Sequence, residues 1–217
     1  MPKSDRPIDP AGLWCEVLSH SLGGGPALFL DRDGVVVEDT EYLSRVEDIA
    51  VIPGAGAVIA AANRQNIPVV LITNQGGIGC GYYGWDEFAA VQAHIMALLA
   101  AEGAHLDAVY ACPHHPEGRG AFAHADHPAR KPNPGMLLRA AKDLSLDLAK
   151  SWLVGDKASD VEAARRAGLA GALQVLTGHG EAERSKMAGF TTPRFDLRLG
   201  GSIADAMTLP IFPAARR

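Results

Sequence analysis

The chain alternates short apolar runs with longer stretches of helical spacing. The apolar runs have the length of strands buried on both faces of a sheet, and they lie at Ala27–Leu30, Pro68–Thr73, Leu106–Ala111, Trp152–Val154 and Ala172–Leu176. Helices are predicted at Ala55–Asn66, Asp86–Glu102, Met136–Leu144 and Ser159–Ala167. Strands that alternate with helices need crossover connections, so the pattern predicts an α/β fold with a doubly wound, parallel sheet.

The boundaries of this pattern indicate how the chain is organised. Residues 1–26 have mixed character and end in Gly23-Gly24-Gly25-Pro26, a run that breaks regular structure. We therefore expect an N-terminal extension, residues 1–26, and a single domain, residues 27–217, of a size that suits one hydrophobic core. A glycine-rich loop, 74–84, and a histidine-rich loop, 112–131, interrupt the alternation. Long loops inside compact domains are usually functional.

Composition narrows the class of partner. The 217 residues include 25 acidic and 20 basic side chains, with a formal net charge of −5, which leaves no electrostatic footprint for nucleic acid or an anionic membrane. No apolar stretch reaches the ~20 residues that span a bilayer, and Met1–Pro10 lacks the apolar core of a secretion signal. The three cysteines have no framework spacing, which favours a reducing compartment. We expect a cytoplasmic monomer that acts on a small dissolved molecule.

Polar residues that could take part in catalysis lie at the ends of three of the apolar runs. Asp31 and Asp33 come after the first run, Thr73 and Asn74 stand at the end of the second, and Asp156 follows the fourth. Ligands of doubly wound folds bind beyond the carboxyl ends of the strands, where these side chains are expected to meet. Two carboxylates two positions apart are suited to complementary catalytic roles. One can attack a phosphoryl group, and the other can protonate the leaving oxygen and later activate water. An Asx turn is the alternative reading of the pair.

Further polar groups suit the handling of phosphate. Thr73 and Asn74 offer a hydroxyl and an amide beside the backbone N–H groups of Gly76-Gly77. Arg130 and Lys131 are adjacent cations that could neutralise a phosphoryl group during transfer. Taken singly, the first feature is also typical of an ordinary turn and the second of a solvated surface.

Gly155-Asp156 offers carboxylate oxygen to a hard cation such as Mg²⁺, while Asp160, four residues on, could add oxygen or simply cap the following helix. Four signals thus occur in the order Asp-x-Asp, Thr-Asn, Lys and Gly-Asp. In this order they resemble the four motifs of the haloacid dehalogenase (HAD) phosphatase superfamily, over residues 27–176. The resemblance implies a Rossmann-like fold and catalysis through an aspartyl-phosphate intermediate.

The resemblance also implies a role for each matched residue. The catalytic residues it implies are Asp31 as nucleophile, Asp33 as acid and base, Thr73 and Lys131. The substrate-binding residues it implies are Asn74, Gln75 and Arg130. The Mg²⁺ ligands it implies are the Asp31 carboxylate, the backbone carbonyl of Asp33, and Asp156.

Longer motifs narrow the resemblance to the branch of D-glycero-D-manno-heptose 1,7-bisphosphate phosphatases and histidinol phosphatases. They are Leu30–Val35, Thr73–Ile78, Cys112–Gly118 and Arg130–Met136. This branch lacks a large cap domain, and it implies hydrolysis of the heptose bisphosphate at C7. Histidinol phosphate is the alternative substrate, and a non-catalytic phosphosugar-binding protein on the same fold is the alternative class.

The histidine-rich loop departs from this branch, which usually binds structural Zn²⁺ through Cys-x-His followed by Cys-x-Cys. Cys112 and His114 match the first pair, but His127 and Ala129 stand at the second. Two alternatives stay open: a Cys-His₃ zinc site in which His124 joins Cys112, His114 and His127, and a loop of ordinary polar residues without metal. In either case we expect the loop to shape the substrate entrance.

Overall fold

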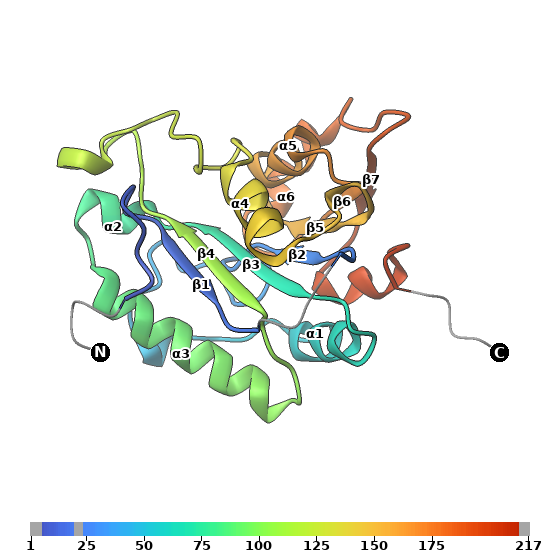
Figure 1. The fold of residues 1–217 in the computed structure, drawn as a ribbon, viewed down its shortest axis with the longest axis horizontal. Coiled ribbons are helices and arrows are strands. Elements are labelled where there is room, and N and C mark those ends of the chain that lie inside the picture. The colour runs from blue at the N-terminus through green and yellow to red at the C-terminus, as the bar shows by residue number, and fades with distance from the viewer. Residues whose placement is uncertain (1–5, 20–23, 213–217) are drawn as a thin grey trace.

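The computed structural model describes residues 6–19 and 24–212. Within these ranges seven strands form one sheet in the order β1-β4-β3-β2-β5-β6-β7, in which only β1 and β4 pair antiparallel. The strands are β1 (Trp14–Val17), β2 (Leu28–Leu30), β3 (Val69–Asn74), β4 (Ala108–Cys112), β5 (Trp152–Gly155), β6 (Gly171–Gln174) and β7 (Asp196–Leu199). The predicted α/β, doubly wound fold is confirmed (Figure 1).

Helices cover both faces of the sheet (Figure 1). On one face lie α1 (Ala55–Arg64) and α3 (Trp85–Ala101), and on the other lie α4 (Gly135–Leu144) and α5 (Ala158–Ala167). The shorter helices are α2 (Gly76–Cys80), α6 (Gly180–Glu183) and the 3₁₀ segments η1 (Val46–Asp48), η2 (Gly120–Phe122), η3 (Leu148–Lys150), η4 (Arg184–Met187) and η5 (Ile203–Thr208). Every strand and long helix that the sequence predicts is present, with ends within two residues of the predicted ones.

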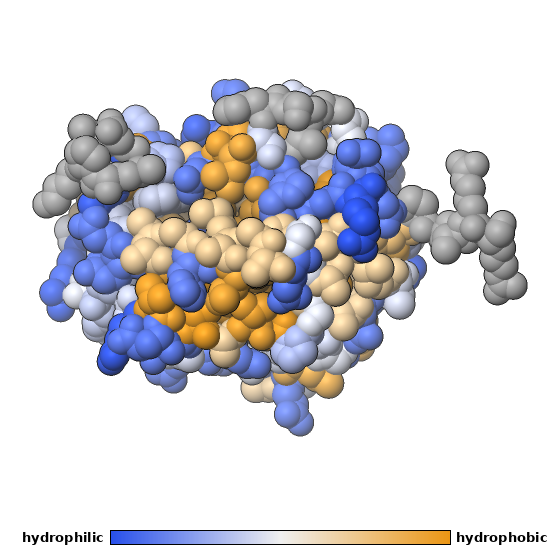
Figure 2. All heavy atoms as spheres, turned by 90° about the horizontal axis from the view of Figure 1, so that it is seen from below, coloured by the Kyte–Doolittle hydropathy of each residue, from blue (hydrophilic) through white to orange (hydrophobic). Residues whose placement is uncertain are grey.

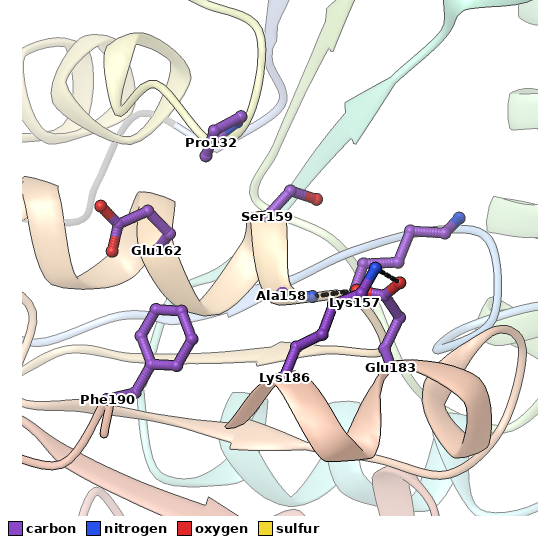
Figure 3. A pocket seen from close by; sticks show the side chains of 8 residues that line it. All are labelled: Pro132, Lys157, Ala158, Ser159, Glu162, Glu183, Lys186 and Phe190. Carbon is purple, nitrogen blue, oxygen red and sulfur yellow. Dashed lines mark hydrogen bonds and ion pairs between the residues drawn. The ribbon is translucent and has the colours of Figure 1, made fainter. Parts of the chain in front are cut away.

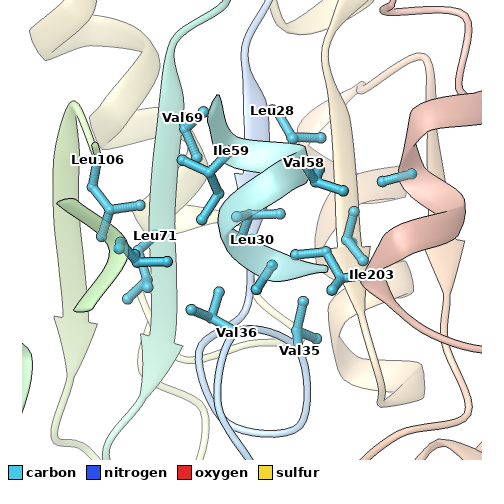
Figure 4. Close-up of a cluster of buried hydrophobic side chains, with 14 of the residues drawn as sticks. Leu28, Leu30, Val35, Val36, Val58, Ile59, Val69, Leu71, Leu106 and Ile203 are labelled. Atoms are coloured by element: carbon cyan, nitrogen blue, oxygen red, sulfur yellow. The ribbon is translucent and has the colours of Figure 1, made fainter. Parts of the chain in front are cut away.

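Two hydrophobic layers hold the helices to the sheet. Leu28 and Leu30 of β2 point into the layer beneath α1, where Val58 and Ile59 meet them (Figure 4). Phe29, between them in the strand, points into the opposite layer with residues of α4 and α5. Successive side chains of a strand alternate between faces, so a strand covered on both sides is apolar throughout. This explains the continuous apolar runs of the sequence.

The sequence does not predict the two edge strands. β1 lies within the expected N-terminal extension and pairs with β4, with Trp14 opposite Ala111. β7 pairs parallel with β6 through the segment Asp196–Leu199. Both strands are four residues long and mix polar with apolar positions, so pairing with a neighbouring strand, rather than local propensity, accounts for them.

The start of α5 positions part of the candidate site. The backbone N–H of Lys157 donates a hydrogen bond of 3.0 Å to Oδ2 of Asp160, which caps the helix directly after β5. The helix ends at Gly168, whose φ of +77° suits a residue without a Cβ atom. Asp156 and Asp160 are thereby brought to the same edge of the sheet.

Figure 2 shows a pale, weakly apolar band across the lower face, in the region of α3, which exposes Ala90, Ala93, Ala97 and Ala100. Among the helices in the described ranges, none is long and apolar enough to cross a membrane. All three cysteines are free thiols.

Candidate active site

The carboxyl ends of β2, β3 and β5, which are neighbours in the sheet, carry the candidate catalytic residues. Asp31 follows β2, Asp156 follows β5, and Asp160 lies in the first turn of α5. One carboxylate oxygen of each lies within 4.8 Å of those of the other two, and all three residues are buried. In the described part of the chain, this is the only cluster of three or more side chains that could hold a metal ion.

Lys131 offsets part of this negative charge. Its ammonium nitrogen lies 2.8 Å from Oδ1 of Asp31 and 2.6 Å from Oδ1 of Asp160, and it donates to the carbonyl oxygen of Ile72 at 3.1 Å. Burial lowers the pKa of Lys131, but the carboxylates of Asp160 and Asp31 outweigh burial and raise that pKa above its usual value. The candidate nucleophile is therefore in contact with a charged lysine.

Asp156 is fully buried and only partly hydrogen-bonded. Its Oδ2 accepts a hydrogen bond of 2.8 Å from the N–H of His179, whereas Oδ1 has no partner among the described residues. Burial, followed by the negative charges of Asp31 and Asp160, raises the pKa of Asp156 to about 8. Three carboxyl groups this close together disfavour one another's ionisation unless a cation offsets their charge. The unpartnered oxygen of Asp156 beside the carboxylate of Asp31 therefore fits a divalent cation with oxygen ligands, while Asp160 bonds to Lys131 and to the start of α5.

Two glycines allow the backbone to approach Asp156 closely. A Cβ atom would lie 2.5 Å from Oδ2 of Asp156 if added at Gly178 and 2.7 Å from it if added at Gly34. Both residues have positive φ, +60° and +82° respectively. Two loops from distant parts of the chain thus enclose the carboxylate without leaving room for another side chain.

Asp33 is held in place by Arg32 and Gln75. Arg32 donates from Nε to Oδ1 of Asp33 at 3.0 Å and from Nη2 to Oδ2 at 3.1 Å, and Nε2 of Gln75 donates to Oδ2 at 3.0 Å. The guanidinium of Arg32 is buried and lies 5.4 Å from the centre of the Phe88 ring. Both carboxylate oxygens of the candidate acid and base are thereby oriented by buried donors.

The residues at and just after the end of β3 form hydrogen bonds that position other residues of the candidate site. Nε2 of Gln75 also donates to Oγ1 of Thr73 at 2.8 Å. The Asn74 amide accepts from the N–H of Lys131 and donates to its carbonyl oxygen, each at 3.0 Å. Asn74 and Gln75 are expected from the sequence to bind substrate, but their amides are bonded to Lys131 and Asp33. The sequence contains no signal for these particular partners.

Arg130 is bonded to the histidine-rich loop, because its Nη1 donates to the carbonyl oxygen of His114 at 2.8 Å.

Two further charged residues, Lys157 and Asp39, border the site and were not expected there from the sequence. Nζ of Lys157 lies 3.1 Å from Asp39 and 3.9 Å from Asp156. Burial lowers the pKa of Lys157, but the neighbouring carboxylates, Asp156 first, outweigh it and raise that pKa. The Gly-Asp-Lys order could have indicated Lys157, whereas Asp39 has no local signal.

A hollow of about 430 Å³ adjoins the site at Lys157 (Figure 3). Pro132 and the first turn of α5 form one side, and residues of α6 and η4 form the other. Oε2 of Glu183 accepts a hydrogen bond of 3.1 Å from the N–H of Ala158, and Glu183 also pairs with Lys186. The hollow therefore has charged walls and borders the candidate active site at Lys157.

The histidine-rich loop brings three of the four candidate zinc ligands close together, but among the described residues their ligand atoms do not form a group that could hold a metal ion. The rings of His114 and His127 stack with centroids 3.6 Å apart and planes 5° apart, and His124 meets His127 edge-on at 5.2 Å. Metal-binding lone pairs lie in the ring planes, so two parallel stacked rings do not direct them at one ion. A Cys-His₃ zinc site is not supported, and the alternative of a metal-free loop agrees with this geometry.

Known proteins are similar to this chain in sequence. The HAD-hydrolase-like family model matches residues 128–195. A curated relative from Mesorhizobium japonicum, named D-glycero-beta-D-manno-heptose-1,7-bisphosphate 7-phosphatase, is 49% identical over 171 residues, which are 76% of this chain and 77% of the relative. This chain belongs to the HAD phosphatases.

Solved HAD structures resemble this chain along most of its length. A structure described as an HAD-like phosphatase, from Mesorhizobium loti, has a TM-score of 0.84 and 41% identity, and the match covers 97% of this chain and 100% of that one. The D,D-heptose 1,7-bisphosphate phosphatase of B. bronchiseptica, complexed with magnesium and phosphate, has a TM-score of 0.73 and 30% identity, with 84% and 96% covered. As an HAD phosphatase, this chain is a phosphoric monoester hydrolase, which confirms the superfamily and reaction class expected from the motifs.

Proposed function

We propose that this HAD phosphatase hydrolyses D-glycero-D-manno-heptose 1,7-bisphosphate at C7, with Mg²⁺ bound by Asp31, Asp156 and the backbone carbonyl of Asp33. The name of the 49% identical relative supports this substrate. The observation that carries the chemistry is the ammonium of Lys131, 2.8 Å from Asp31, beside the unpartnered buried oxygen of Asp156. A nucleophile next to a fixed cation, with a place for a second cation, suits attack on a dianionic phosphate.

Asp31 is the proposed nucleophile of the first step. One of its carboxylate oxygens forms a bond to phosphorus while the bond between phosphorus and the sugar oxygen breaks, and Asp33 gives the departing oxygen its proton. Lys131 holds the attacking carboxylate and offsets the charge that the phosphate brings. Mg²⁺ would bind phosphate oxygen and neutralise its charge.

Asp33 changes role in the second step. It takes a proton from water while the water oxygen bonds to phosphorus, and the bond from phosphorus to Asp31 breaks to release phosphate. Arg32 and Gln75 hold both oxygens of Asp33, so the same carboxyl group stays correctly oriented through both steps. Asn74 acts as a positioning residue, since its amide forms hydrogen bonds with both the N–H and the carbonyl oxygen of Lys131.

The test is a comparison of kcat/KM for the heptose bisphosphate, histidinol phosphate and an aryl phosphate, with wild-type protein and Asp31→Asn. We expect the heptose bisphosphate to be preferred, and the nearly isosteric variant to fold but to lack turnover on all three compounds. A preference for histidinol phosphate would overturn the proposed substrate. Normal turnover by Asp31→Asn would overturn the mechanism, and a protein inactive on every phosphate ester would point to the non-catalytic alternative.

A further inference from the structure

A second hollow, of about 410 Å³, lies between the N-terminal segment and α3 and shares no residue with the candidate active site. Its apolar wall consists of Trp14 from β1 and of Ala89, Ala93 and Met96 from α3. The volume lies within the range of pockets that bind small molecules. The hollow adjoins the alanine-rich face of α3, which contributes to the pale band in Figure 2.

Gln92 belongs to this wall and is the polar side chain whose bonding is least complete. It is 1% exposed, and neither its amide oxygen nor its amide nitrogen has a hydrogen-bond partner among the described residues. It shares the buried face of α3 with Phe88, Val91 and Ile95. Buried polar groups without partners are rare and destabilising, so a molecule that bonds to this amide would gain from it. Because the amide atoms are buried in this structure, binding requires the Gln92 side chain to change rotamer and turn its amide toward the hollow.

The rim of the hollow is charged, with carboxylates in excess. Arg6 pairs with Asp86, and Glu16 accepts a hydrogen bond of 3.0 Å from Nε1 of Trp14. Two carboxylates against one guanidinium disfavour an occupant that carries phosphate or carboxylate groups. The same carboxylate oxygens are good acceptors for hydroxyl groups. The rim therefore favours an uncharged, hydroxylated molecule.

We propose that this hollow binds an uncharged purine nucleoside of the adenine type, with its ring against Trp14 and Met96 and its donor–acceptor edge on Gln92. A side-chain carboxamide can form two hydrogen bonds with the adenine edge, one donated and one accepted, which would satisfy both free atoms of Gln92. Aromatic and thioether side chains make favourable contacts with a flat ring. The ribose hydroxyls donate to the rim carboxylates. This site stands apart from the phosphatase chemistry and does not depend on the function proposed above.

Calorimetric titration of the full chain with adenosine tests the proposal. Tryptophan fluorescence is a second readout, because Trp14 lies in the wall and its ring centre is 5.7 Å from that of Trp85. We expect saturable binding with a Kd of about 1 mM or lower. N6,N6-dimethyladenosine cannot donate from N6 and should bind about tenfold more weakly, the effect of one ordinary hydrogen bond. Absence of saturable binding by adenosine, or equal affinity for the two nucleosides, would overturn the proposal.

Two variants distinguish binding of adenosine in this hollow from nonspecific binding elsewhere. Gln92→Met keeps a long side chain but removes the amide, so adenosine should bind about tenfold more weakly while the unfolding midpoint stays unchanged or rises. Ala93→Leu enlarges an exposed side chain that lines the hollow and should abolish binding. Since Ala93 is exposed, this change leaves the core intact and keeps the test valid should Gln92→Met fold poorly. Wild-type affinity in either folded variant would refute the assignment.

Discussion

Replacement of Lys131 by methionine tests the charge balance of the candidate catalytic cluster formed by Asp31, Asp156 and Asp160. The ammonium is the shared partner of Asp31 and Asp160, and the residue is only 4% exposed. Removing one partner of a buried ion pair typically costs about 3–5 kcal/mol, because the opposite charge is left buried and unpaired. We expect the free energy of unfolding of the metal-free protein to fall by about this amount. Methionine fills much of the same space, so the loss reflects charge more than a cavity.

A second substitution identifies charge as the cause. Asp160→Asn removes one of the carboxylates that Lys131 neutralises, while its amide oxygen can still accept from the N–H of Lys157. In the double variant we expect about 0.5–3 kcal/mol of the single-variant loss to be recovered, as for residues in one ion-pair network. Urea unfolding of wild type, both single variants and the double variant completes the cycle. Strictly additive losses, or a loss below about 1 kcal/mol for Lys131→Met, as for an exposed ion pair, would refute the reasoning.

Three further changes address the acid, the metal and the backbone around it. Asp33→Asn should lower kcat for a sugar phosphate by about 10²–10⁴-fold, and by less for an activated aryl phosphate whose leaving group needs no proton; equal losses in steady-state assays would argue against the acid role. Asp156→Ala should abolish both turnover and the rise in thermal unfolding midpoint that Mg²⁺ produces; activity that survives this substitution and exhaustive chelation would remove the metal from the mechanism. Gly178→Ala would place a methyl group 2.5 Å from Oδ2 of Asp156, so calorimetry should show weaker Mg²⁺ binding. Gly103→Ala is its matched control, because Gly103 also has positive φ, +73°, but no described atom lies within 4 Å of the added carbon; equal Mg²⁺ affinity in the two variants would contradict the steric argument.

The catalytic edge could be predicted because it depends on a general property of parallel sheets. Asp31 and Asp156 each follow a buried apolar run, and β2 and β5 pair in parallel, so both carboxylates come to the same edge. Asp160 lies in the first turn of the helix after Asp156, where the sequence left open whether it adds metal-binding oxygen or caps the helix, and the structure shows the cap. Local pattern and spacing were sufficient to place Asp31 and Asp156 at this edge of the sheet.

The partners of the charged and amide groups could not be predicted in the same way. Asn74 bonds to the backbone of Lys131 across 57 positions, and Lys157 pairs with Asp39 across 118. Such pairs depend on how loops fold over the edge of the sheet, and no local period encodes that. The zinc alternative depended on residue types in one loop, whereas metal binding depends on ring orientation, which in this loop follows from the stacking of His114 on His127.

β1 is another element that local sequence pattern does not predict, and it forms part of the second hollow. Trp-Cys-Glu-Val at 14–17 has no strong strand pattern, yet pairing with β4 brings Trp14 against the Phe88 ring at 5.2 Å, beside α3. Gln92 follows Phe88 by one helical turn and was readable from the sequence as a polar residue on an apolar face. A polar side chain in such a position conflicts with the local pattern, and conflicts of this kind concentrate at functional sites. Two amide atoms of Gln92 without a partner, beside the hollow that Trp14 helps to form, are the observation on which the proposed nucleoside site rests.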